Sequence, residues 1–274
     1  PWMAAVDNGA SGGTQSAAIN FGQRPFASTP PAGYKSVCTT NLPNPVIKKP
    51  SDHFDVKTWT GNGNAITVGN TAKQTNAYQI SRSVRLRSSN NAYLTRTPSV
   101  ASNRRTWTWS GWVKRGSLSS RQIVWGASTS DFNTDTHWEF YTGDQIRFST
   151  YVSGIYFELI TNAIYRNTTG WYHVVAAMDT TQTTDSNRAK LYVNGIQVTS
   201  FSTETYPSLN YETQMNTTLA HSLGRDGAYS GGYYFDGHMA EVNFIDGQML
   251  TASSFGQFDA NNNWVPRSYT GTYG

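Results

Sequence analysis

The chain has 274 residues, a net charge of +4 and a single cysteine, with 14% charged and 14% aromatic residues; so many large side chains exclude a disordered protein. One cysteine excludes an intrachain disulfide, and no run of 18 apolar residues is present, so the sequence offers no membrane-spanning helix. The basic residues are mostly scattered, with one modest cluster between Arg82 and Arg105, and this distribution argues against nucleic-acid binding.

Residues 1–50 differ in composition from the rest of the chain. Six of the ten prolines fall between Pro25 and Pro50, and proline fixes φ and removes a backbone donor, so this stretch is expected to be an extended linker. A short strand is expected at 17–22. We interpret residues 1–50 as the C-terminal strand or strands of a preceding domain plus a Pro-rich linker, which lean on a neighbouring chain or complete another domain by strand addition.

Residues 51–80 are expected to connect this segment to the main domain, with a short hairpin over residues 52–70. The main domain covers residues 81–274. Short stretches rich in β-branched and aromatic residues, separated by turn residues, predict about a dozen strands there: 83–86, 92–95, 106–114, 121–126, 138–141, 145–150, 156–160, 171–178, 190–193, 196–201, 220–223 and 239–244. This pattern of short strands and turns indicates an all-β fold, a two-sheet antiparallel jelly-roll sandwich.

Two predicted strands show where the core lies. Trp107 and Trp109 alternate with threonines, so both indoles are expected on one face of their strand. The strand at 171–178 is apolar on both faces and is expected to be central. Asn194-Gly195 predicts a two-residue type I′ turn, which pairs Val193 with Ile196. The hairpin should then have one dry face and one wet face.

Three sequence blocks carry a further signal. They are TWTWSGWVKR at 106–115, WYHVV and LYVNG between 171 and 195, and YFDGHMAEVNF at 234–244, followed by a short helical turn at 251–255. In this order they resemble the jelly-roll domains of laminin-G and concanavalin-A-like lectins, over about residues 81–256. The sequences FIDGQ, at 244–248, and WVP, at 264–266, are similar to those of lectin-like modules of bacteriophage structural proteins. Residues 18–47 resemble the C-terminal tail of a neighbouring SPRY-like domain.

Catalytic residues are not expected. A retaining glycosidase needs two carboxylates about 5–5.5 Å apart, and the only acid two or four positions from Glu139 is Asp135, which we expect in a loop. The group His137-Trp138-Glu139 is the nearest thing to a catalytic motif and is better explained as polar positions beside a core aromatic. No nucleophile triad or phosphate loop is present. The chain is therefore predicted not to be an enzyme, with a polysaccharide depolymerase as an alternative.

The resemblance implies binding residues of two kinds. Aromatic side chains stack on sugar rings, and the carbohydrate-binding candidates are Trp125, Trp138, Tyr151, Tyr156, Tyr229, Tyr233 and Tyr234. Calcium is the one cofactor that the family suggests, and loop carboxylates suit this hard cation. The candidate ligands are Asp131, Asp135, Asp179, Asp185 and Asp226, although no two of them have a diagnostic spacing.

The resemblance also suggests a role. We expect a virion structural protein, made in the bacterial host cytoplasm and exposed on the virion surface, with a lectin-like module that adsorbs to host surface glycans. Its expected partners are other virion proteins and further copies of itself as a homo-oligomer, without nucleic-acid binding or membrane insertion. A purely structural role in capsid decoration or fibre assembly, without a ligand, is the alternative.

Overall fold

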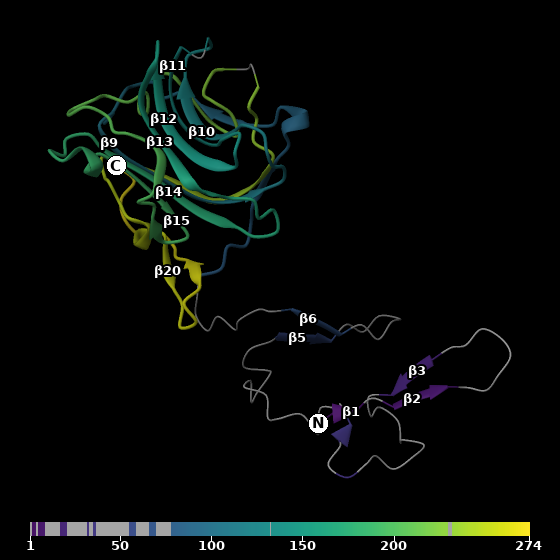
Figure 1. Ribbon diagram of the computed structural model, residues 1–274. Helices are drawn as coiled ribbons and strands as arrows, with labels where there is room; N and C mark the ends of the chain where they lie inside the picture. Colours follow the sequence, from purple (N-terminus) through teal and green to yellow (C-terminus); the bar gives the residue numbers. More distant parts are fainter. Residues whose placement is uncertain are drawn as a thin grey trace. The chain divides into compact units, whose positions relative to one another are not determined.

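The computed structural model describes residues 78–131, 133–229 and 232–274, together with short stretches of the first 75 residues (Figure 1). The chain divides into two compact units, Pro1–Thr75 and Asn76–Gly274. In the first unit β1 (Trp2–Met3) pairs in parallel with β4 (Lys35–Ser36), and β2 (Ala5–Asn8) pairs with β3 (Ala17–Asn20). The strands β5 (Asp55–Thr58) and β6 (Ile66–Gly69) pair antiparallel.

The predictions about the first unit fall partly on described residues and partly outside them. The strand expected at 17–22 coincides with β3, and the hairpin expected over 52–70 coincides with β5 and β6. Most of the expected linker lies outside the described residues, although β4 (Lys35–Ser36) lies within it, and the connecting turn also lies outside them. The division into 1–50, 51–80 and 81–274, and the strand addition expected for the first segment, stay predictions.

The second unit is an all-β jelly-roll sandwich of two antiparallel sheets, as predicted. The seven-stranded sheet has the order β17 (Phe201–Thr205), β13 (Ile155–Ile164), β12 (Gln145–Val152), β11 (Thr134–Phe140), β10 (Gln122–Ser128), β18 (Ala220–Leu223) and β8 (Leu94–Arg96). The six-stranded sheet has the order β16 (Ile196–Gln197), β15 (Ala189–Val193), β14 (Tyr172–Asp179), β9 (Thr106–Arg115), β19 (Gly237–Asp246) and β7 (Val84–Leu86). Every sheet edge is thus a strand of five residues or fewer.

The core between the two sheets is built on tryptophan. Trp107 and Trp109 of β9 are fully buried on the same face, as the alternation predicts. The ring centroid of Trp109 lies 4.9 Å from that of Trp138 on the opposite sheet, in an edge-to-face contact. Such pairs add about 0.5–1.5 kcal/mol to the gain from burying apolar surface. The indoles therefore join the two sheets at their centre.

The hairpin at Asn194-Gly195 has the predicted register but not the predicted faces. Both turn residues have positive φ, 48° and 83°, and Val193 pairs with Ile196. Leu191 is buried in the main core, whereas Ile196 is 61% exposed at the sheet edge. The face expected to be wet is covered, because Tyr192 is 7% exposed. The prediction of one dry and one wet face is wrong, because later residues of the chain pack on the second face.

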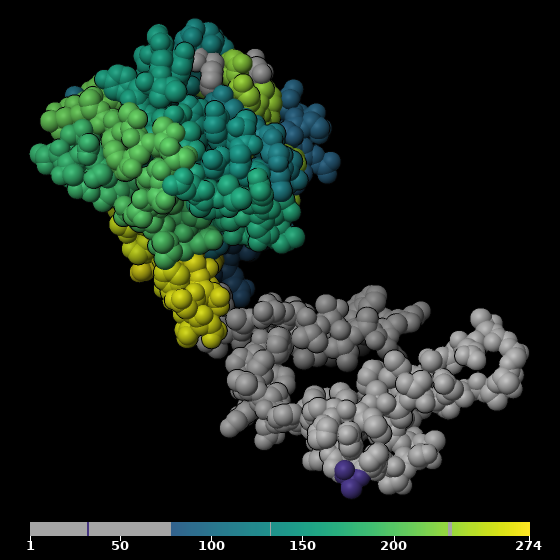
Figure 2. Space-filling view, viewed as in Figure 1, coloured from purple at the N-terminus to yellow at the C-terminus, as the bar shows by residue number. Residues whose placement is uncertain are grey.

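The covering residues form a C-terminal segment that crosses the outer face of the six-stranded sheet. It contains η5 (Ala252–Ser254), β20 (Gly256–Phe258) and β21 (Trp264–Pro266), and β20 pairs with β21. Phe255 and Ala252 pack with Val175 and Tyr192 in a second, smaller apolar cluster. Figure 2 shows this yellow segment as a projection against the green and teal atoms of the sandwich. The short turn predicted at 251–255 coincides with η5.

Strand boundaries bring two further corrections. The predicted strand 196–201 is two strands, because β16 belongs to the six-stranded sheet and β17 to the seven-stranded sheet. Asp135, expected in a loop, is the second residue of β11. The central position predicted for 171–178 is confirmed, since β14 lies between β15 and β9. Within the part of the chain that the structure describes, no helix has the length and apolar character needed to cross a membrane.

Candidate functional site

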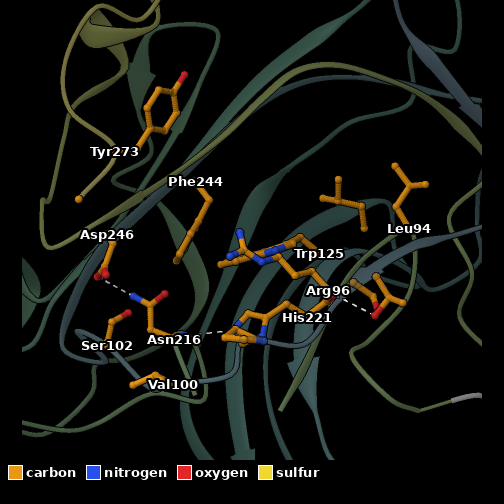
Figure 3. A pocket seen from close by; sticks show the side chains of 15 residues that line it. Leu94, Arg96, Val100, Ser102, Trp125, Asn216, His221, Phe244, Asp246 and Tyr273 are labelled. Carbon is orange, nitrogen blue, oxygen red and sulfur yellow. Dashed lines mark hydrogen bonds between the residues drawn. The ribbon is translucent and has the colours of Figure 1, made fainter. Parts of the chain in front are cut away.

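A groove of about 670 Å³ lies where the β8 edge of the seven-stranded sheet meets β19 of the other sheet (Figure 3). Its residues come from β8, β10, β18 and β19, from the loop at 98–102, from Asn216, and from the C-terminal Tyr273 and Gly274. The side chains of Phe244 and Trp125 point into it from the two sheets. Elements far apart in the sequence therefore build one concave surface.

The floor of the groove is aromatic. The ring of Trp125, which is 5% exposed, lies with its centroid 5.0 Å from that of Phe244. Larger exposed surfaces stand at the rim, where Tyr273 is 53% exposed, Leu94 51% and Val100 75%. An apolar floor with an exposed aromatic rim suits a ligand that presents flat C–H faces.

Polar groups with fixed orientation line one wall of the groove. The side-chain amide of Asn216 donates to Asp246 Oδ1 at 2.7 Å, and its backbone N–H donates to His221 Nε2 at 3.0 Å. His221 Nδ1 in turn bonds the carbonyl of Leu219 at 2.8 Å. Because Nε2 accepts, Nδ1 carries the ring proton. Burial also lowers the pKa of His221, so the imidazole is neutral at neutral pH.

The groove also offers one cationic side chain. Arg96 is exposed on β8 and makes no ion pair within the described residues. The side-chain nitrogen of Asn216 donates to both Asp246 and the carbonyl of Asn103, so Asn216 and Asp246 offer a ligand their oxygens as acceptors. The Arg96 guanidinium supplies donors beside them, above the aromatic floor (Figure 3). This combination suits polar ligands with apolar faces, and it contains no arranged nucleophile and base.

A second group of functional side chains lies on the outer face of the seven-stranded sheet. We call it the polar cluster; it consists of Arg121, Asp135, His137, Glu139, Arg147, Glu158 and Asp226. The alternation of β11 places three of these side chains on the outer face, opposite the core residues Trp138 and Phe140. The sequence did not predict this cluster, because Asp135 was assigned to a loop.

Ion pairs join most of the polar cluster. Arg147 Nη1 lies 3.1 Å from Glu139 Oε1, and Arg147 Nε lies 2.5 Å from Glu158 Oε1. Arg121 Nε pairs with the other Glu139 oxygen at 2.5 Å. His137 Nδ1 lies 2.9 Å from Asp135 Oδ1. Charged hydrogen bonds of this kind offset part of the large cost of burying charge.

The environment shifts the pKa values of these groups in opposite directions. Burial alone would lower the pKa of His137, but the charges and hydrogen bonds of Asp135 and Glu139 raise it to about 10. Burial opposes ionisation of Glu139, yet His137 and Arg121 hold its pKa below the usual value. Burial raises the pKa of Asp226 well above the usual value, and the neighbouring carboxylates add to this effect.

The carboxylates of the polar cluster are closed to a large substrate. Asp135, Glu139 and Asp226 are fully buried, and Glu158 is 9% exposed. The chain that follows β18 lies against the cluster, because the Arg121 guanidinium carbon lies 4.3 Å from the centroid of the Tyr233 ring. A glycosidase needs carboxylates that reach the sugar. The arrangement therefore does not fit a polysaccharide-cleaving site.

The predicted sugar-stacking residues do not form one site. Trp125 lies in the floor of the groove, and Tyr156 is 45% exposed and stacks on Tyr211 with centroids 4.1 Å apart. Trp138 is fully buried in the main core, so its assignment to a sugar-stacking surface is wrong. The remaining candidates lie elsewhere: Tyr151 is half-buried on β12, Tyr229 stacks on Tyr233, and Tyr234 lies beside Tyr93.

The predicted metal ligands are also divided. Asp131 accepts hydrogen bonds from Thr129 and Asn133 in an exposed turn. Asp179 accepts from Thr181 and Gln182 at the end of β14, and Asp185 begins η4 (Asp185–Asn187). Only Asp135 and Asp226 come together, with His137 between them in the polar cluster. No local sequence signal joins Asp226 to the other two, because 91 residues separate it from Asp135.

The fold defines a jelly-roll sandwich protein, and comparison with known families agrees with it. The Laminin_G_3 model, which describes the concanavalin A-like lectin/glucanases superfamily, matches residues 87–254. The chain belongs to this superfamily. The predicted resemblance is confirmed at this level, whereas the bacteriophage origin and the SPRY-like first segment stay predictions. No curated protein sequence gives a significant match.

Solved structures resemble the chain distantly. The heptameric SAP-like pentraxin of Limulus polyphemus is 14% identical, with a TM-score of 0.44 over 62% of this chain and 77% of its own. Domains LG4-5 of the mouse laminin α1 chain are 14% identical, with a TM-score of 0.42 over 65% of this chain and 45% of theirs. The CBM40 of the Ruminococcus gnavus IT-sialidase, bound to α2,3 sialyllactose, is 13% identical, with a TM-score of 0.42 over 65% of this chain and 96% of its own. These likenesses concern the fold and not the ligand.

Proposed function

We propose that this chain is a non-enzymatic carbohydrate-binding module on the surface of a bacteriophage particle, where it adsorbs to host glycans through the groove between β8 and β19. The observation that carries the proposal is the aromatic floor of Trp125 and Phe244 beside the fixed polar groups of Asn216 and Asp246. Sugars present C–H faces and hydroxyl groups together, and this groove offers a partner for each.

The accessible parts of the groove predict weak binding at each site. The floor ring of Trp125 is only 5% exposed, so most of the contact must come from the rim, where Tyr273 and Arg96 are open to solvent. Several linked copies raise the overall affinity without any new contact. The phage setting is supported by the sequence likeness of 244–248 and 264–266 to phage lectin-like modules, and a multicopy particle supplies the valency that such a site needs.

The experiment is a glycan array probed with the chain displayed at high valency on a nanoparticle. The test variant is Arg96→Ala with Tyr273→Ala, which removes two exposed rim groups and leaves the core intact. The control is Arg87→Ala with Tyr156→Ala, which makes the same changes at exposed residues away from the groove. We expect at least tenfold weaker glycan binding in the test variant and unchanged binding in the control.

Each other outcome contradicts a defined part of the proposal. Loss of binding only in the control would move the glycan site to the Tyr156 surface. An array without hits at high valency would favour the ligand-free role in capsid decoration or fibre assembly. Release of reducing sugars from host polysaccharide would establish a depolymerase instead. Absence of the chain from purified phage particles, measured by mass spectrometry, would overturn the proposed location.

A further inference from the structure

The polar cluster contains three residues in the arrangement of a metal centre. One donor atom each from Asp135, His137 and Asp226 lies within 4.8 Å of the other two. All three side chains are at most 1% exposed. Ligands about 2.1 Å from a tetrahedral metal ion are about 3.4 Å apart, so shifts of about 1 Å would bring the three donors into coordination distance.

A second, independent observation concerns the carboxylate oxygens themselves. Asp226 Oδ1 and Oδ2 and Asp135 Oδ2 are buried and have no hydrogen-bond partner among the described residues. A buried carboxylate oxygen without a partner costs several kcal/mol. Coordination of a cation would satisfy all three oxygens.

The charge of the polar cluster indicates the charge of that cation. A metal ligand must be deprotonated, so His137 is neutral and Asp226 is ionised when a metal ion is bound, and the four carboxylates then exceed the two guanidinium groups by two negative charges. The carboxylates belong to Asp135, Glu139, Glu158 and Asp226, and the guanidinium groups to Arg121 and Arg147. A divalent cation neutralises this excess. Because the cluster is buried, neutrality matters more here than it would at the surface.

The strand next to the cluster leaves room for Asp226. Gly126 of β10 lies opposite His137 of β11. A Cβ atom at Gly126 would lie 2.3 Å from Asp226 Oδ1 and 2.9 Å from the Cβ of His137. Only glycine therefore allows the Asp226 carboxylate to lie against the strand beside the imidazole. The glycine thus leaves the space that the donor from the distant loop occupies.

From this geometry we infer that Asp135, His137 and Asp226 form a site for a divalent transition-metal ion, with zinc or manganese as the best fit. Imidazole nitrogen suits zinc better than calcium, which takes six to eight oxygen ligands. Asp135 and Asp226 are among the carboxylates expected to hold calcium, but the imidazole and the burial change the preferred ion. Glu139 and Ser149, which lie 3.4 Å and 3.3 Å from His137 Nε2, can orient the ring from behind.

The test measures zinc and calcium binding to the full chain after EDTA treatment and dialysis, by isothermal titration calorimetry and thermal unfolding. We expect one zinc ion per chain, a Tm raised by several degrees, and a calcium affinity at least tenfold lower. Asp226→Asn should abolish the zinc-induced rise in Tm. It should still fold, because the substitution removes a buried charge and keeps the shape. Asp131→Asn, at an exposed aspartate outside the cluster, is the matched control and should bind zinc normally.

Three results would overturn the inference. One is the absence of zinc- or manganese-induced heat and Tm shift in the unmodified chain. Another is zinc binding that is equally strong in Asp226→Asn, which would mean a surface site elsewhere. The third is calcium binding at least as tight as zinc binding, which would restore the oxygen-only site. A crystal of the zinc-treated chain adds a direct measurement, since an anomalous peak at the zinc edge must lie among the three donor atoms.

Discussion

The outer faces of the two sheets are both shielded from solvent, one over charged side chains and the other over apolar ones. On the seven-stranded sheet, His137 lies among Asp135 and Glu139 and has a pKa raised to about 10. On the six-stranded sheet, His173 lies between the rings of Trp112 and Trp264, and burial lowers its pKa to about 3. Both histidines are 1% exposed, yet at neutral pH His137 is positively charged and His173 is neutral.

The difference between the faces distinguishes the residues that stabilise the sandwich from the residues that need a functional reason to be there. Apolar burial under the C-terminal segment contributes about 25 cal/mol for each Å². A buried ionic network recovers little beyond its desolvation cost and is often no more stable than an apolar replacement. The apolar face therefore serves stability, whereas the polar cluster needs another reason to persist, and the proposed metal site supplies one.

Breaking the ion pairs of the charged face should have the largest effect. In Arg147→Met, Glu158 loses its only ion-pair partner among the described residues, and we expect a loss of about 3–5 kcal/mol in the free energy of unfolding. Urea denaturation of the EDTA-treated chain measures it.

Two controls test the physical cause of that loss. Arg147→Met with Glu158→Gln should recover most of it, because no carboxylate is then left unpaired. Glu212→Gln breaks exposed ion pairs with Arg104 and Arg105 and should cost less than about 1 kcal/mol. Similar losses in Arg147→Met and Glu212→Gln would contradict the contrast between buried and exposed pairs.

On the apolar face, Trp264→Ala should lower the free energy of unfolding by about 3 kcal/mol. The partly exposed indole fills the space between two glycines, and its removal leaves a cavity. A Cβ at Gly195 or Gly256 would lie within 2.4 Å of its ring. Denaturant unfolding measures the loss. Phe258→Ala, at a neighbouring ring that is 44% exposed, is the control with a smaller expected loss. Equal losses would mean that Trp264 is not the residue that anchors the C-terminal segment.

The smallest effect expected is a pH dependence from His173. Trp264 Nε1 donates to His173 Nδ1 at 3.1 Å, so Nδ1 cannot take a proton without losing this bond. The folded chain keeps the ring neutral down to about pH 3, whereas the unfolded chain protonates near pH 6.5. The unfolded chain therefore binds more protons in this window. The free energy of unfolding decreases as the pH is lowered, by up to about 1.4 kcal/mol for each pH unit.

A substitution isolates the contribution of His173 from that of other groups. The free energy of unfolding is measured between pH 7 and pH 4.5 for the unmodified chain and for His173→Asn. The difference between the two curves should shrink as the pH falls, because the variant lacks the titrating ring. Parallel curves would show that His173 does not titrate differently on folding.

The fold was predictable because its signals are local. The alternation at Trp107 and Trp109 and the turn at Asn194-Gly195 depend on neighbouring residues only, and the structure confirms both. The wet face assigned to Tyr192 was wrong because residues 60 or more positions later cover it. Strand alternation predicts which residues share a face, but not what lies on that face.

The candidate sites were harder to predict, for a related reason. The Asp135, His137 and Glu139 pattern could have been found from strand alternation if β11 had been assigned its full length. Asp226 could not, because a loop brings it to the cluster. In the groove, Asn216, Asp246 and Tyr273 come from three different parts of the chain. A site assembled from separate parts of the chain has no characteristic residue spacing by which the sequence could reveal it.

The short edge strands have a consequence for any arrangement that brings many copies of this chain together. An open sheet edge is a template on which another chain can add a strand, and crowding favours such growth. Here the edge strands β16, β7 and β8 have two, three and three residues, and β17 has five. Arg85, Arg96 and Glu204 place charges along them. The sandwich can therefore be packed densely on a surface with little tendency to fuse into fibres.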